Sequence, residues 1–236
     1  MQFVPELVTG GAVCAGSGVF SWAAVAPSSQ LFGPTTRHTG DSSTIALTFD
    51  DGPNPVVTPS LLELLARHDV TATFFLIGKN VETNAAIVRD ISARGHVIGN
   101  HTHTHPNLTF RSSRAISQEI ERCDDAIESA AGGTSKWIRP PFGYRGPALA
   151  GTARKRAQRV AMWSFAARDW KLKNAEALIR RLRRVQGGDI VLLHDGDHRV
   201  PNGDRHHTVA ALECMLPRWK DAGFRFVTMD EIGNDR

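Results

Sequence analysis

Thr48-Phe49-Asp50-Asp51-Gly52-Pro53 joins an apolar run to two consecutive carboxylates and a Gly-Pro break. The run that leads into it, residues 45–49, is rich in apolar and β-branched residues, which predicts a strand. Successive side chains of a strand point to opposite sides, so the two acids are expected to take different roles at its end. Asp, Gly and Pro are also common turn residues, so this stretch alone fits an ordinary turn equally well.

Strand-like and helix-like segments alternate from residue 45 onward, with short connections. The predicted strands cover residues 45–49, 71–77, 96–98, 137–138, 158–165, 189–193 and 224–227. Helical patterns lie between them, and βα alternation of this kind implies a parallel sheet. Seven strands favour a small or incomplete (β/α) barrel over a full eight-fold barrel of ~250 residues. The predicted fold class is therefore α/β.

The composition is that of a soluble globular protein. Of the 236 residues, 41% are hydrophobic and 22% charged, and the formal net charge is +4. A nucleic-acid-binding protein usually carries a continuous basic stripe with stacking aromatic residues, and the sequence has none. The arginines at 180–184 lie in a helical pattern and fit a solvated helix face. We expect no nucleic-acid partner, and we expect a monomer.

Residues 1–40 differ from the rest of the chain. Residues 7–26 are mostly small and apolar, which fits an uncleaved anchor or a degenerate signal segment. Glu6 is the only charge before them, whereas a signal peptide carries Lys or Arg there. Gly33-Pro34 and the polar run after it predict a linker into a domain over residues 41–236. We expect weak membrane association through residues 7–26 and a place in the cell envelope or outside the cell, with the cytoplasm as the alternative.

Residues that could act in catalysis or bind a metal follow most of the predicted strands. In parallel βα folds, the sites are built from the carboxyl ends of several strands. The residues at these positions are Asp50, Asp51, His101, His105, Arg139, Asp169, Trp170 and His194. One polar residue at a strand end is unremarkable, but this repetition predicts a single site.

The run His101-Thr102-His103-Thr104-His105 predicts a metal site. Imidazole is a common metal ligand, and two His with one carboxylate leave coordination positions for water and substrate. His101, His105 and Asp51 form such a set, and we expect His103 to be a loop or wall residue. The set suits a divalent ion, with Zn²⁺ favoured and Co²⁺, Mn²⁺ or Ni²⁺ as alternatives.

Hydrolysis at such a site needs a base for the attacking water and an acid for the leaving group. Asp50 lies next to the ligand Asp51 and is the predicted base, and His194 is the predicted acid. Asp169 is expected to orient His194, and Arg139 to hold the carboxylate of Asp50. A structural ion pair between Arg139 and Asp169 is a competing interpretation.

Five ordered motifs resemble those of the polysaccharide deacetylase family, carbohydrate esterase family 4, with its chitooligosaccharide deacetylases. They are Thr48–Pro53, His101-Thr102 with His105, Arg139–Phe142, Asp169-Trp170, and Leu192 with His194. The resemblance implies a distorted barrel of β/α units. It also implies metal-dependent removal of acetyl groups from the sugars of a polysaccharide or oligosaccharide.

The resemblance assigns further roles and the partner. Leu192 and Trp170 would line the acetyl pocket, and the backbone N–H of Phe142, together with the metal, would stabilise the oxyanion. The partner would be an acetylated glycan, namely chitin oligomers, peptidoglycan or acetylxylan. N- and O-deacetylation both remain open.

Two other functions are compatible with parts of this pattern. One is a metal-dependent hydrolase of small non-sugar amides on the same fold. The other is a catalytically silent glycan-binding module, although a pure binder needs neither Asp50 nor His194. Acetate release from acetylated glycans with and without added metal would separate them.

Overall fold

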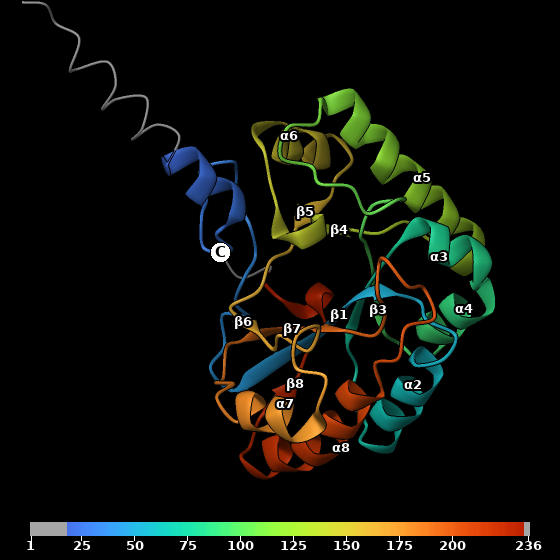
Figure 1. The fold of residues 1–236 in the computed structure, drawn as a ribbon, viewed down its shortest axis with the longest axis vertical. Coiled ribbons are helices and arrows are strands. Elements are labelled where there is room, and N and C mark those ends of the chain that lie inside the picture. Colours follow the sequence, from blue (N-terminus) through green and yellow to red (C-terminus); the bar gives the residue numbers. More distant parts are fainter. Residues whose placement is uncertain (1–17, 234–236) are drawn as a thin grey trace, which may run out of the picture.

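Strands and helices alternate along the chain in the predicted way (Figure 1). The computed structural model describes residues 18–233. Residues 18–25 are helical. The elements after them are β1 (Thr44–Gly52), α2 (Thr58–Arg67), β2 (Thr73–Leu76), α3 (Gly78–Thr83), α4 (Ala85–Ala93), β3 (Val97–Asn100), α5 (Ser113–Ala131), β4 (Trp137–Ile138), the 3₁₀ turn η1 (Pro141–Gly143), α6 (Pro147–Lys155), β5 (Arg159–Val160), β6 (Phe165–Ala166), α7 (Ala175–Leu182), β7 (Ile190–His194), α8 (His206–Asp221), β8 (Arg225–Phe226) and η2 (Met229–Glu231).

The strands form one curled sheet in the order β5-β4-β3-β2-β1-β7-β6, with β8 paired to β1. The pairings between these strands are parallel. Helices α2, α4, α5, α7 and α8 lie around the outside of the curl (Figure 1). This confirms the predicted distorted barrel of about seven strands.

Residues 158–165 do not form the single predicted strand. β5 pairs with β4, whereas β6 pairs with β7, so the two short strands lie at opposite ends of the series. The residues between them leave the ladder: the Met162 N–H donates to the carbonyl of Thr36, and the Met162 carbonyl accepts from Arg139. The largely apolar run of residues 160–165 looks like part of one strand in the sequence, but here the chain crosses from one edge of the sheet to the other.

β1 runs through the middle of the sheet and is buried at all nine positions. Ile45, Leu47 and Phe49 pack in the main core, which includes leucines of α2 and α8. Ala46 belongs to a separate apolar cluster with Phe75 and Trp137. Because side chains alternate along a strand, Thr48 and Asp50 share the side of Ala46. Asp50 therefore points into the curl of the sheet at its carboxyl end.

The helix of residues 18–25 is attached to the body by Arg145. The Nη2 of this arginine donates to the carbonyls of Ala23, Ala26 and Ser29 at 3.3, 2.7 and 3.2 Å. No helix within residues 18–233 is long and apolar enough to span a bilayer. Residues 7–17 of the predicted anchor lie outside the described residues, and the division at residue 40 stays a prediction.

Candidate active site

The two carboxylates at the end of β1 face the same imidazole. His101 Nε2 lies 3.7 Å from Asp50 Oδ2 and 3.5 Å from Asp51 Oδ1. Strict alternation would have turned Asp51 to the opposite side, but the register of β1 against β2 shifts between Asp50 and Gly52. Asp51 has φ 72°, in the left-handed region. The local irregularity therefore brings both acids to one site, and the prediction of opposite directions is wrong.

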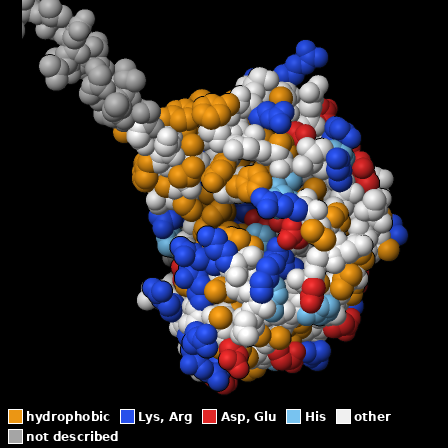
Figure 2. All heavy atoms as spheres, viewed as in Figure 1, with side chains coloured by type: hydrophobic (Ala, Val, Ile, Leu, Met, Phe, Trp, Pro, Cys, Tyr) orange, Lys and Arg blue, Asp and Glu red, His pale blue; other side chains and the backbone are white. Residues whose placement is uncertain are grey.

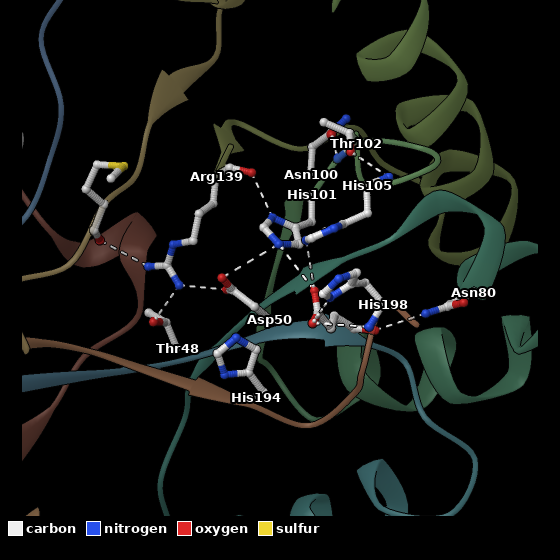
Figure 3. A network of polar contacts seen from close by, with 12 residues as sticks. Thr48, Asp50, Asn80, Asn100, His101, Thr102, His105, Arg139, His194 and His198 are labelled. Atoms are coloured by element: carbon white, nitrogen blue, oxygen red, sulfur yellow. Dashed lines mark hydrogen bonds and ion pairs between the residues drawn. The ribbon is translucent and has the colours of Figure 1, made fainter. Parts of the chain in front are cut away.

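The loop after β3 supplies the two histidines (Figure 3). His101 Nδ1 lies 2.7 Å from the Arg139 carbonyl. A carbonyl only accepts, so Nδ1 carries the proton and Nε2 keeps a lone pair that is free for a metal ion beside Asp51. The Nε2 of His105 lies 3.2 Å from Asp51 Oδ1. Asn100 shapes this loop, because its Oδ1 accepts from the Thr102 N–H at 2.8 Å.

Asp51, His101 and His105 fit a divalent metal ion. One ligand atom from each lies within 4.8 Å of the others, and all three residues are buried. Asp51 Oδ1 has no hydrogen-bond partner among the described residues, although it is fully buried. Burial alone would raise the pKa of Asp51, but the three histidines around the carboxylate, His101, His105 and His198, hold this pKa well below its usual value. Burial lowers the pKa of His105, which favours the neutral ring that a metal needs.

Arg139, directly after β4, holds Asp50. Its side chain is fully buried, and Nη1 donates to Asp50 Oδ1 and to Thr48 Oγ1, both at 2.8 Å. The guanidinium also lies over the Phe75 ring, 4.0 Å from the centroid. Burial lowers the pKa of Arg139 despite the neighbouring Asp50, yet a guanidinium keeps its charge in proteins. The contacts favour the predicted partnership with Asp50 over an ion pair with Asp169.

His194 is the last residue of β7, and its ring is hydrogen-bonded to Asp169. Its Nδ1 is 2.9 Å from Asp169 Oδ1, and its backbone N–H donates to Asp169 Oδ2 at 2.7 Å. Burial alone would lower the pKa of His194, but the charge and hydrogen bond of Asp169 raise it to about 9. Asp169 also accepts from Thr208 Oγ1 at 3.2 Å. Asp169 thus fixes the orientation of the imidazole and favours its charged form.

These groups meet at a cavity of about 360 Å³. The predicted residues that line it are Asp50, Asp51, His101, His105, Phe142, Trp170, Leu192 and His194. Arg139 and Asp169 lie behind Asp50 and His194 and are fully buried. Phe142 has φ 60° within η1 and is 43% exposed. The ring of Trp170 lies 5.1 Å from that of His194. Figure 2 shows the hollow, with acidic and histidine side chains at its base.

His103 is the one histidine of the loop that does not line the cavity. Its ring is buried against α3, where a Cβ on Gly78 would collide with it. Its nearest acid is Glu82, 3.8 Å away. The prediction of a loop or wall residue is confirmed by the loop position, and His103 does not line the cavity.

Sequence reasoning missed several residues of the site. Trp163, His198 and Arg199 line the cavity, and Asn80 Nδ2 donates to the Asp51 carbonyl at 2.9 Å. His198 lies in the loop after β7 and reaches Asp51 across the cavity mouth. The only sequence signal for it was its position four residues after His194, which does not predict where a loop folds.

Known proteins are similar to this chain in sequence and in fold. The sequence model of the polysaccharide deacetylase family matches residues 37–161. A peptidoglycan-N-acetylglucosamine deacetylase of Bacillus cereus is 38% identical over 197 residues, which cover 80% of this chain and 87% of the relative. This chain belongs to the polysaccharide deacetylase family. A chitooligosaccharide deacetylase of Sinorhizobium fredii is 38% identical over 187 residues, covering 76% of this chain and 87% of the relative.

A solved structure of the same family agrees with the fold. It is a peptidoglycan N-acetylglucosamine deacetylase in complex with 4-naphthalen-1-yl-N-oxidanyl-benzamide. The two chains superpose with a TM-score of 0.79 at 34% identity, covering 86% of this chain and 93% of the other. As a family member, the protein is a carbohydrate deacetylase, a metal-dependent hydrolase that removes acetyl groups from acetylated sugars.

Proposed function

We propose that this deacetylase removes the N-acetyl group from N-acetylglucosamine residues of a cell-wall glycan. The observation that carries the proposal is the meeting of three groups at one cavity. These are a carboxylate held by an arginine, a histidine held by a carboxylate, and an Asp-His-His set. The relatives named for N-acetylglucosamine support the choice of an amide over an ester.

Asp51, His101 and His105 would hold the metal, and we propose Zn²⁺, with Co²⁺, Mn²⁺ or Ni²⁺ as substitutes. A bound divalent ion polarises a carbonyl and lowers the pKa of its water. The carbonyl of Arg139 keeps the His101 lone pair directed at the site.

Asp50 takes the proton of the attacking water as the new C–O bond forms. Its Oδ1 is bound to Arg139, which leaves Oδ2 toward the cavity and fixes the direction of proton transfer. The backbone N–H of Phe142 would donate to the oxyanion that develops on the acetyl carbon.

His194 donates a proton to the sugar nitrogen as the C–N bond breaks. Its pKa of about 9 keeps it protonated at neutral pH. Trp170 and Leu192 lie beside it in the cavity and would enclose the acetyl methyl group. The products are acetate and a glucosamine residue.

Acetate release tests the proposal. The chelator-treated protein, with and without added Zn²⁺, is incubated with peptidoglycan, N-acetylglucosamine oligomers, acetylxylan and small acylated amines. We expect zinc-dependent release from the first two substrates. Release from acetylxylan alone would make the enzyme an esterase, and release from small amides alone would favour the non-sugar alternative. Glycan binding without release of acetate would indicate a silent module.

We also propose that the protein works at the cell envelope as a monomer with weak membrane contact. Exposed apolar side chains gather around the helix of residues 18–25, at one edge of the cavity face (Figure 2). They include Val19, Trp22, Val25, Leu31 and Phe110, between 47% and 87% exposed. The apolar sequence of residues 7–17 continues into this helix. Co-sedimentation of the full chain with phospholipid vesicles tests the contact, and a protein that stays entirely in the supernatant contradicts it.

A further inference from the structure

The loop of residues 195–205 folds over the metal-ligating carboxylate, and His198 is its point of contact (Figure 3). The backbone N–H of His198 lies 3.3 Å from Asp51 Oδ2, and its ring Nδ1 lies 3.4 Å from the same oxygen. The other oxygen, Oδ1, faces His101 and His105. The two oxygens of Asp51 therefore have different partners, and Oδ1 is the one that faces the other two proposed metal ligands.

The ring of His198 is packed between two groups of the site. It stacks on His105 with centroids 4.3 Å apart and planes 21° apart. It also meets the edge of the Phe142 ring, at 5.1 Å and 89°. His198 thereby links a metal ligand to a residue of the cavity wall.

The two histidine ligands are oriented in different ways. His101 has a hydrogen bond from Nδ1 to the Arg139 carbonyl. His105 Nδ1 is buried and has no hydrogen-bond partner in the described part of the chain. Its ring lies against His198 on one side and Phe142 on another. Packing by these two rings replaces the hydrogen bond that usually orients a ligating histidine.

Hydrogen bonds hold the loop that carries His198 in place. Arg205 is 3% exposed, and it donates to the Gly196 carbonyl at 2.9 Å and to Asp197 Oδ2 at 2.8 Å. Asn54 Nδ2 donates to the Gly203 carbonyl at 2.8 Å. A Cβ on Gly196 would collide with the Asp51 carbonyl, so the close crossing depends on this glycine.

We propose that His198 is a positioning residue of the metal site. It occupies Oδ2 of Asp51, so that the carboxylate offers Oδ1 alone, and it holds the ring of His105 toward the same point. The assignment rests on the proposed metal site of Asp51, His101 and His105. Groups that orient metal ligands typically change metal affinity about 10–100-fold when they are removed.

Metal affinity tests the assignment without any glycan. The full-length apo protein is titrated with Zn²⁺ in competition with a chromophoric chelator. We expect His198→Ala to bind Zn²⁺ about 10–100-fold more weakly than the wild type. His198→Phe keeps a stacking ring and His198→Asn keeps a donor near Nδ1, so each should recover part of the loss. His206→Ala is the matched control, since His206 is exposed and pairs with Asp204 at 2.8 Å; its affinity should not change.

Two results would overturn the proposal. Zn²⁺ affinity of His198→Ala within about twofold of the wild type would show that the contact has no effect. A loss as complete as that of Asp51→Asn, with a changed Co²⁺ absorption spectrum, would make His198 a direct ligand instead. If Asp51, His101 and His105 did not form a metal site at all, the result would be different, because the wild type would then bind Zn²⁺ no more tightly than Asp51→Asn.

Discussion

Two buried ion pairs flank the cavity, and each holds one of the two groups that we propose to transfer protons. On the side of β1 and β4, Arg139 is fully buried and Asp50 reaches the cavity. On the side of β7, Asp169 is fully buried and His194 reaches the cavity. In both pairs the fully buried residue holds the cavity-lining one by charge and by hydrogen bonds.

The pairs differ in the sign of the hidden charge. The hidden group beside Asp50 is a guanidinium, a permanent cation, which suits a proton acceptor. The hidden group beside His194 is a carboxylate, which raises the pKa of the imidazole to about 9 against the opposing effect of burial, and this suits a proton donor. The sign of each hidden charge therefore agrees with the role that we propose for its partner, acceptor for Asp50 and donor for His194.

The largest effect on the reaction rate is expected from removing His194, the proposed proton donor. In His194→Gln, the sugar nitrogen leaves without a proton from the protein, so kcat should fall about 10²–10⁴-fold. Initial rates of acetate release from N-acetylglucosamine oligomers measure this. Zn²⁺ affinity should stay within a few-fold of the wild type, and a rate within tenfold of the wild type would remove His194 from the role of acid.

The next largest effect, on the free energy of unfolding, is expected from removing the buried guanidinium of Arg139. Arg139→Met leaves the buried Asp50 without its partner, and the free energy of unfolding should fall by about 3–5 kcal/mol. Urea unfolding measures it. Arg94→Met is the matched control, because Arg94 pairs with Glu63 and Asp90 at the surface and should cost less than about 1 kcal/mol. Equal losses in the two variants would contradict a structural role for the buried pair.

The smallest expected effect is a shift in the pH dependence of the deacetylation rate. A raised pKa means that His194 is protonated below about pH 9, so the deacetylation rate should fall as the pH rises through that value. Asp169→Asn removes the raising charge, and the alkaline limb of the kcat profile should move about one to three units lower. Asp204→Asn, at an exposed residue, is the control. An unshifted limb in Asp169→Asn would show that another group sets it.

Much of the site could be predicted because its residues are tied to strand ends. The apolar run before Asp50 and the loop start after Asn100 mark carboxyl ends of strands in a parallel sheet, and the topology brings such ends together. His101 and His194 therefore line one cavity, and Arg139 lies directly behind it against Asp50. This inference needed only the strand order along the chain.

Other features depended on packing that local sequence does not encode. Residues 158–165 separate into β5 and β6 because their partners β4 and β7 lie at opposite ends of the sheet. The direction of Asp51 depends on a register shift and a positive φ. His198 reaches Asp51 only because the loop is tied by Arg205 and crosses at Gly196. Each of these follows from long-range contacts, which a periodicity pattern cannot show.

The division of labour between adjacent acids is the central claim, and one paired measurement tests it. Zn²⁺ affinity and acetate release from N-acetylglucosamine oligomers are measured for Asp50→Asn and Asp51→Asn. We predict that Asp50→Asn keeps Zn²⁺ affinity within a few-fold and loses at least about 10²-fold in kcat, whereas Asp51→Asn loses Zn²⁺ affinity itself. If Asp51→Asn bound Zn²⁺ as tightly as the wild type, or Asp50→Asn kept the wild-type rate, the assigned roles of the two carboxylates would be wrong.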